Sequence, residues 1–170
     1  NLKKIGNSAF KNCINLESVS FKNKLEEIGG YAFSDCSKLK SISCPSSLKI
    51  IDGGAFSYND KLTNVKLNKG LQKINKYAFS YTGIKNIDIP DSVTTLGTYI
   101  FSGCKKLESV KMPENDKAKL SEGMFYHCKA LKNVDITSGI KTIGESAFYG
   151  CENLKSIKLP DSVKKIEGFA

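Results

Sequence analysis

The fold is decided by the stretch IGESAFYGCENLKSIKLP, residues 143–160, because almost all of the chain repeats it. Its phenylalanine, Phe148, has counterparts earlier in the chain, which are Phe10, Phe33, Phe56, Phe79, Phe101 and Phe125. The step between them is constant except that Phe79–Phe101 is one residue short and Phe101–Phe125 is one residue long. A period of about 23 residues is typical of solenoids, in which each repeat buries its apolar residues against its neighbours. We therefore expect residues 1–170 to form one solenoid of about seven units.

Each repeat predicts two extended segments. Leu154, Ile157 and Leu159 alternate with polar residues as a strand requires, and Pro160 ends the strand because proline cannot donate to a ladder. A second short extended segment carries Val163 and Ile166. We expect the strands of successive repeats to form one continuous parallel sheet. The segment around the phenylalanine is too short for a stable helix alone, so we expect one turn of 3₁₀ or α-helix with the phenylalanine pointing inward.

The outward positions of the expected strands form two variable columns along the solenoid. Such columns are free to serve a partner, although free drift would produce the same variation. The candidate partner-binding residues are Glu17, Lys40, Thr63, Lys85, Glu108, Lys132 and Lys155 in one column and Lys66, Asp88, Lys111, Asp135 and Lys158 in the other. A uniform column between them is expected to be structural, because stacked hydroxyls and amides can hydrogen-bond along a sheet. Its members are Ser18, Ser41, Asn64, Asn86, Ser109, Asn133 and Ser156.

Two repeats, the fourth and the sixth, have irregular lengths. Repeat four lacks one residue within Tyr81–Ile84, and repeat six is entered through residues 113–120, which are one residue longer than usual. Insertions in solenoids map to surface loops and often to the binding face. A loop also tolerates a changed length at little entropic cost. The sequence leaves both interpretations open for these irregular units.

The repeat can be written [LV]-x-x-[IL]-G-x-x-A-F-x-x-C-x-x-L-x-x-[VI]-x-[LI]-P, and this unit resembles the BspA-like leucine-rich repeat, also called the Treponema type. The resemblance covers essentially the whole chain and departs where Asp52, Asn75 and Glu167 replace glycine and in residues 114–120. It implies a leucine-rich-repeat solenoid with a parallel β-sheet and short helical turns. It also implies a surface or secreted protein whose activity is adhesion to extracellular or host proteins and glycoproteins, without fixing the ligand.

Five of the six cysteines share one slot, three residues after a repeat phenylalanine; they are Cys13, Cys36, Cys104, Cys128 and Cys151, and Asn59 and Thr82 fill the slot elsewhere. Leucine-rich repeats use a small buried residue here to hydrogen-bond the turn. We expect free buried thiols, although adjacent rungs are close enough for a Cys13–Cys36 or Cys128–Cys151 disulfide. Cys44 instead fills an inward strand slot as a small hydrophobe. The absence of a C-x-x-C spacing argues against zinc.

The charge of the chain indicates a solvated surface. The formal net charge is +9, and all 26 basic residues are lysine. Nucleic-acid readers use arginine forks and surface aromatics, whereas we expect most aromatics here to lie inside the repeats, so we expect no nucleic-acid partner. No apolar run approaches the roughly 18 residues of a membrane helix, and no signal peptide is visible. Because both ends fall inside a repeat without a polar cap, we expect an uncapped fragment of a longer array.

No group of residues predicts catalysis or a cofactor. His127 is the single histidine and occupies a variable slot, so we expect it at the surface. Without a second histidine, neither a metal triad nor a Ser-His-Asp or Cys-His site is expected. The Gly29-Gly30 and Gly53-Gly54 pairs fall at repeat turns and do not form a phosphate loop. No inward pair of carboxylates recurs.

The sequence therefore favours a non-enzymatic, adhesin-like interaction module, expected to be a monomer, that presents a β-sheet face to a protein or glycoprotein. The resemblance places it at the cell surface or among secreted proteins. The alternative is a structural spacer that projects another domain and has no ligand of its own. A catalytic role would require a domain outside these residues.

Overall fold

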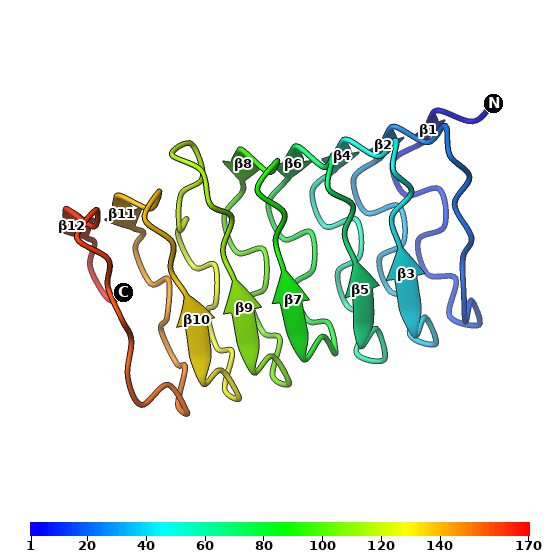
Figure 1. Cartoon of the computed structure of the whole chain (residues 1–170). Coiled ribbons are helices and arrows are strands. Elements are labelled where there is room, and N and C mark those ends of the chain that lie inside the picture. Colours follow the sequence, from blue (N-terminus) through cyan, green and yellow to red (C-terminus); the bar gives the residue numbers. More distant parts are fainter.

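The structure, a computed structural model, describes all 170 residues as a row of stacked coils (Figure 1). One series of strands consists of β3 (Ser41–Ser43), β5 (Asn64–Lys66), β7 (Asn86–Asp88), β9 (Ser109–Lys111) and β10 (Asn133–Asp135). A second series consists of β1 (Lys4–Ile5), β2 (Glu27–Ile28), β4 (Ile50–Ile51), β6 (Lys73–Ile74), β8 (Thr95–Leu96), β11 (Thr142–Ile143) and β12 (Lys165–Ile166). All strand pairs are parallel, and each joins equivalent positions of neighbouring repeats, as Ser41 and Asn64 do. The predicted leucine-rich-repeat solenoid is confirmed.

A column of phenylalanines runs through the centre of the coils. Phe33, Phe56, Phe79, Phe101 and Phe125 are fully buried, and the centroids of neighbouring rings lie 5.1–5.9 Å apart from Phe10 to Phe148. Leucine and isoleucine from the strands surround this column in one continuous core. The inward direction predicted for the phenylalanines is confirmed. The spacing of this column is even, so the coils stay in contact at their centre throughout the stack.

The turn that carries each phenylalanine is not helical, so the predicted 3₁₀ or α-helical turn is wrong. In repeat two, the amides of Tyr31, Phe33 and Asp35 donate to carbonyls of repeat three at 2.8–3.0 Å. The amides between them, of Ala32 and Ser34, each donate to the carbonyl three positions earlier. A helix would keep its amides within its own coil. Here alternate amides instead form a third ladder between repeats, beside the two strand series.

This ladder places two left-handed residues in each repeat, two positions before and two positions after the phenylalanine. Their φ angles lie between 53° and 74°. Asparagine, aspartate and glycine adopt this conformation most readily, which explains the variable slot that His127 shares with Asn12, Asp35, Gly103 and Gly150. The structure places His127 at the surface only in part, because its ring packs edge-on against Tyr126 with centroids 4.3 Å apart.

All seven tyrosines lie along this turn, on a surface that we call the tyrosine edge; they are Tyr31, Tyr58, Tyr77, Tyr81, Tyr99, Tyr126 and Tyr149. Five of them occupy left-handed slots. Their rings lean toward the following repeat, and a Cβ added at Gly54 or Gly103 would overlap the ring of Tyr31 or Tyr81. Where tyrosine follows tyrosine the rings stack, as in Tyr58–Tyr81 at 4.9 Å. The expectation that most aromatics lie inside the repeats is therefore wrong for every tyrosine.

The first strand series is broken in the middle of the molecule, so the prediction of one continuous sheet is wrong. Strand β3 pairs with β5, and β7 pairs with β9 and β10, but β5 and β7 do not pair (Figure 1). The break falls between repeats three and four, where the chain is one residue short. The second series remains intact across the same position, because β4 and β6 pair through Ile51 and Ile74. The coils therefore separate on one face only.

The predicted strands of the two outermost repeats do not form ladders. In repeat one, a single bridge joins Ser18 to Ser41, and residues 154–159 of repeat seven make no strand pairing. Each of these segments has a neighbour on one side only, and Ile157 and Leu159 remain 37% and 40% exposed. The uniform serine and asparagine column also bonds less than predicted, because the single direct side-chain hydrogen bond within it joins Ser109 to Asn86 at 2.7 Å.

The cysteine slot binds the turn as predicted. The thiols of Cys36, Cys104, Cys128 and Cys151 donate to the phenylalanine carbonyl of the preceding repeat at 3.0–3.2 Å. In the same slot, the Asn59 amide donates to the Phe33 carbonyl of the preceding repeat and to the Phe56 carbonyl of its own repeat. All six cysteines are free, and Cys44 is buried in the strand slot expected for it. These five slot residues therefore connect two repeats through the phenylalanine carbonyl, whereas Thr82 donates to Phe79 within its own repeat.

Candidate functional site

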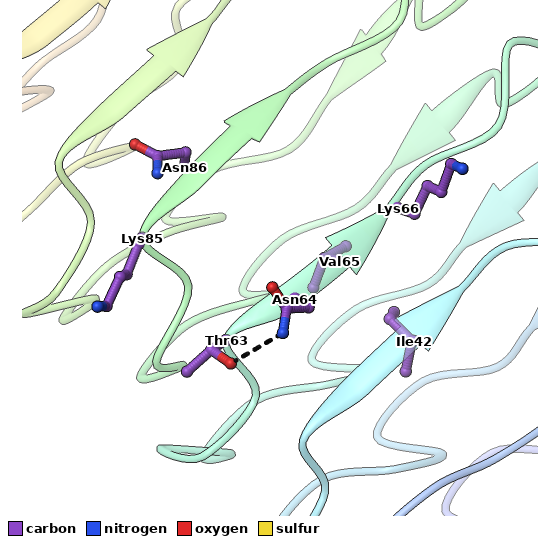
Figure 2. Close-up of a pocket in the computed structure, with 7 residues that line it drawn as sticks. All are labelled: Ile42, Thr63, Asn64, Val65, Lys66, Lys85 and Asn86. Atoms are coloured by element: carbon purple, nitrogen blue, oxygen red, sulfur yellow. Dashed lines mark hydrogen bonds between the residues drawn. The ribbon is translucent and has the colours of Figure 1, made fainter.

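The break between β5 and β7 opens a cleft on the strand face, which we call the seam. Its first part has a volume of about 510 Å³ and is lined by Ile42, Thr63, Asn64, Val65, Lys66, Lys85 and Asn86. Figure 2 shows Thr63–Lys66 on the β5 side and Lys85 and Asn86 on the β7 side. Two further clefts, of about 310 and 470 Å³, continue along the same strands to Leu67, Asp88 and Lys111. The seam thus follows the whole length of the two strands.

The floor of the seam is apolar. Val65 and Leu67 are partly exposed there, whereas the residues at the position of Val65 in other repeats, Ile42, Ile87 and Val110, are buried. Lysine, aspartate, threonine and asparagine side chains line the rim. An apolar floor with a few polar groups around it is typical of binding sites in proteins. The seam has this composition because inward residues of repeat three lose their neighbours.

Backbone groups at the seam lack the partners that they have elsewhere in the sheet. In the closed part of the stack, the Glu108 amide donates to the Lys85 carbonyl at 2.7 Å, and the Cys44 amide donates to the Lys66 carbonyl at 2.9 Å. The equivalent amides at the seam belong to Lys85 and Leu67, and neither donates to a backbone carbonyl. Unpaired strand edges are the groups through which extended segments add to a sheet. The seam therefore offers hydrogen-bonding groups as well as apolar surface.

The structure brings five of the twelve candidate residues together at the seam; they are Thr63, Lys66, Lys85, Asp88 and Lys111. Asp135 and Lys158 line a separate cleft of about 320 Å³ between repeats six and seven. Lys155 is exposed and belongs to neither cleft. The two predicted columns therefore do not form one uniform surface, because the missing residue of repeat four concentrates part of them at one place.

The other four candidates are paired with one another. Lys40 contacts Glu17 and Lys132 contacts Glu108, each at 2.7 Å between Nζ and Oε2. The hydrogen bond from each lysine lowers the pKa of the Glu17 and Glu108 carboxyls below the ordinary value. Exposed ion pairs of this kind add little to stability. They do neutralise charge locally, so these four residues are less available to a charged partner than Lys66 and Lys85, which have no ion pair.

No cluster of three or more histidine, cysteine, aspartate or glutamate side chains could hold a metal ion. Burial raises the pKa of Cys44 to about 12 and that of Cys104 and Cys151 to about 11. Thiols with such pKa values are protonated at neutral pH, and the thiolate is the nucleophile. No helix of the structure has the length and the apolar character that crossing a membrane requires.

Sequence reasoning did not identify the floor or the inner rim of the seam. Val65 and Leu67 were expected to be core residues, and Asn64 and Asn86 were expected to be scaffold. The signal for the site was the shortened step from Phe79 to Phe101. A changed length shows that one repeat is irregular, but it does not show on which face the coils separate.

Solved structures with the same fold come from several bacteria. A leucine-rich repeat protein of T. pallidum shares 28% identity with a TM-score of 0.80, and the match covers 95% of this chain and 73% of that one. A leucine rich cell surface protein of Faecalibacterium prausnitzii A2-165 has 24% identity and a TM-score of 0.55, with coverage of 97% and 66%. The pneumococcal vaccine antigen PcpA has 23% identity and a TM-score of 0.58, with coverage of 95% and 49%.

No curated protein matches the chain. The model of the BspA type leucine rich repeat region matches residues 1–108 and 72–170, with six copies of the repeat. Together these matches cover every position, and the repeat columns of the structure place the same residue types at the same points of each coil. The chain therefore belongs to the BspA-type leucine-rich repeat family.

Proposed function

We propose that the chain is a non-enzymatic interaction module of a cell-surface protein and binds an extracellular protein or glycoprotein through the seam. The observation that carries this proposal is the local opening of the strand face, which exposes Val65 and Leu67 beside unpaired strand edges. Surface residence is supported by the family and by the relative from Faecalibacterium prausnitzii, which is described as a cell surface protein. Exposed apolar surface rimmed by polar groups is a feature of interaction sites.

The seam suits an extended segment of a partner protein. An extended chain presents amide and carbonyl groups at the spacing of a strand, and it alternates side chains toward and away from the sheet. The unpaired edges would bind its backbone, and the apolar floor would receive its inward side chains. Lys66 and Lys85 favour a segment that carries acidic residues. No single residue of the seam needs to act chemically for this function.

The proposal is tested by binding to a panel of extracellular matrix and plasma glycoproteins at modest salt. The charge reversals Lys66→Glu and Lys85→Glu are expected to weaken any interaction found, together with Val65→Ser, which makes the floor polar. The matched control is Lys155→Glu, which changes an exposed lysine of the same column outside the seam. An equal loss of binding with the control variant would mean that the interaction depends on the overall positive charge of the surface and not on the seam. Absence of binding across the whole panel would contradict the proposal.

The structural spacer is the second candidate function, and the ion pairs along the solenoid favour it for part of the surface. Glu17–Lys40 and Glu108–Lys132 connect successive repeats and occupy outward positions that a binding face would leave free. The spacer predicts that Lys66→Glu and Lys85→Glu leave adhesion of the parent protein unchanged. It also predicts that adhesion depends on the number of repeats. The two functions are therefore separated by the same variants in an adhesion assay.

A further inference from the structure

A second concave site lies on the tyrosine edge, away from the seam. It has a volume of about 360 Å³ and is lined by Tyr58, Asp60, Tyr81, Thr82, Gly83, Gly103, Lys105 and Lys106. We call it the notch. It results from the same missing residue, because the turn after Phe79 is shorter than the turns of repeats three and five on either side. Gly83 lies so close to the carbonyl of Asp60 that a Cβ would overlap it. The floor of the notch is therefore in direct backbone contact with repeat three.

The walls of the notch differ in chemistry. Tyr58 and Tyr81 form one wall as a stacked pair, with ring centroids 4.9 Å apart and planes within 6°. One face of the Tyr81 ring covers Gly103, and the side chain remains 45% exposed. Asp60 stands on repeat three, and Lys105 and Lys106 stand on repeat five. A small concave surface thus combines an aromatic wall, one carboxylate and two ammonium groups.

The charged groups and the tyrosine hydroxyls around the notch have no partners within the protein, whereas the Thr82 hydroxyl donates to the Phe79 carbonyl at 2.9 Å. Asp60, Lys105 and Lys106 form no ion pair and no side-chain hydrogen bond, although seven other lysines of the chain are ion-paired. The hydroxyls of Tyr58 and Tyr81 also donate no hydrogen bond, whereas the Tyr99 hydroxyl donates to Glu122 at 2.9 Å. Five residues with unpartnered polar groups therefore line one cavity, and these groups remain available to a ligand.

We propose that the notch binds a sugar residue that carries a carboxylate. An apolar C–H edge of a pyranose ring contacts the exposed rim of the Tyr58–Tyr81 stack, because the faces of the Tyr81 ring are occupied by Tyr58 and Gly103. The hydroxyls of the sugar donate to a carboxylate such as Asp60, and its own carboxylate accepts charge-assisted hydrogen bonds from Lys105 and Lys106. The volume is at the small end of ligand sites, which fits one or two sugar residues. Each wall of the notch therefore has a partner on such a sugar.

Other ligand classes fit this combination less well. A nucleotide or phosphopeptide would find no arginine for bidentate phosphate binding, because all 26 basic residues of the chain are lysine. A neutral sugar would leave the two lysines unpaired. An acidic peptide would satisfy the lysines without using the tyrosine wall. The site is independent of the proposed function, because it lies on a different face from the seam and is lined by different residues.

The test uses the whole chain, Asn1–Ala170, and a hexasaccharide of alternating glucuronic acid and N-acetylglucosamine. Binding is followed by calorimetry and by amide chemical shifts, with the largest shifts expected at Gly83 and Gly103. The same oligosaccharide with its carboxyls reduced to alcohols is expected to bind at least about tenfold more weakly, because it loses charge-assisted hydrogen bonds. Hexaglutamate supplies the charge without the sugar ring and is expected to bind more weakly as well.

Two pairs of variants complete the test. Tyr81→Ala and the double variant Lys105→Gln/Lys106→Gln are each expected to weaken binding about tenfold or more. Their controls are Tyr149→Ala on the same edge and Lys141→Gln/Lys164→Gln, which are exposed elsewhere. Equal weakening by the controls, equal affinity for the reduced oligosaccharide or hexaglutamate, or no binding would overturn the proposal. If a variant does not fold, the site of binding is decided by the amide chemical shifts of the unaltered protein, which should change most at Gly83 and Gly103. Shifts confined to the seam would likewise exclude the notch.

Discussion

At the scale of single residues, Gly83 is among the positions that leave no room for a side chain. Glycine is required here because the Cβ of any other residue would overlap the backbone of Asp60. A left-handed conformation is not the reason, since the φ angle of Gly83 is not positive. The left-handed slots follow another rule, since tyrosine, serine and histidine occupy them as well as glycine. Glycine therefore serves two purposes in these repeats, and only the contacts of each position distinguish them.

The first prediction concerns this contact. Gly83→Ala is expected to lower the free energy of unfolding by about 1–3 kcal/mol, the usual cost of forcing extra volume into a packed site. Urea unfolding followed by circular dichroism measures the change. Gly6→Ala is the control, because nothing lies within 4 Å of its Cβ position. A variant as stable as the control would show that repeats three and four are not in contact at Gly83.

The second prediction concerns Cys44 and pH. Burial raises the pKa of its thiol to about 12, whereas an unfolded cysteine titrates at about 8.5. Between these values the unfolded state releases its proton first, so the stability present at pH 8 is lost as the pH rises. One such group contributes about 1.4 kcal/mol per pH unit across that window. The unfolding free energy should therefore fall more steeply with pH in the natural chain than in Cys44→Ala.

The measurement is urea unfolding at pH 8, 9 and 10 for both proteins. Because the lysines, tyrosines and other cysteines are common to both, their titration cancels in the difference. The expected difference between pH 8 and pH 10 is about 2 kcal/mol. Parallel pH profiles would mean that the Cys44 thiol is not held away from water.

At the scale of elements, each repeat interacts with the next through three ladders, which are the two strand series and the turn that carries the phenylalanine. Repeats two and three, which have the usual length, keep all three in register, as the Ser41–Asn64 and Ile28–Ile51 pairs show. In repeat four the missing residue lies between the turn and β7. The turn and the second strand series remain paired, and the first strand series alone loses its pairing.

The third prediction follows from this register. A lysine inserted between Gly83 and Ile84 restores the usual repeat length and should allow β5 and β7 to pair. Each backbone hydrogen bond gained contributes about 0.5–1.5 kcal/mol, so the free energy of unfolding should rise by about 1–3 kcal/mol. Hydrogen exchange should slow at the amides of Lys85 and Leu67. Binding by both the seam and the notch should weaken.

The control is a lysine inserted between Asp60 and Lys61, which gives repeat three one residue too many. It should not stabilise the protein. Exchange in the natural chain also tests the seam directly, since the Lys85 amide should exchange faster than the Glu108 amide, which donates to the Lys85 carbonyl. Equal protection of these two amides would show that the seam is closed in solution.

At the scale of the whole molecule, the coils share one continuous core, and each coil depends on its neighbours. Stability in such a molecule is approximately a sum of repeat and interface contributions. The fourth prediction is that deletion of residues 47–69, one complete period of the repeat, leaves a folded but less stable solenoid. Deletion of residues 47–58 instead removes about half a period, including Ile51 and Phe56, and should not fold. It joins β3 to β5 through too few residues for a parallel crossover and leaves one coil without its second strand and its phenylalanine. Circular dichroism and thermal unfolding measure both outcomes, and similar behaviour of the two deletions would contradict a repeat-based core.

The sequence alone determined the solenoid, its period, the phenylalanine column, the cysteine slot and the family, because each depends on residue types recurring at a fixed step. It also showed that repeat four is one residue shorter than the others. Only the tertiary structure decided how the backbone of the turn pairs, which is why the helical turn was wrong, and where the tyrosines lie. Only the tertiary structure also decided which ladder opens around the short repeat. The reason is physical, because a one-residue deficit can be absorbed by any of three ladders, and the packing between neighbouring coils selects the one that yields.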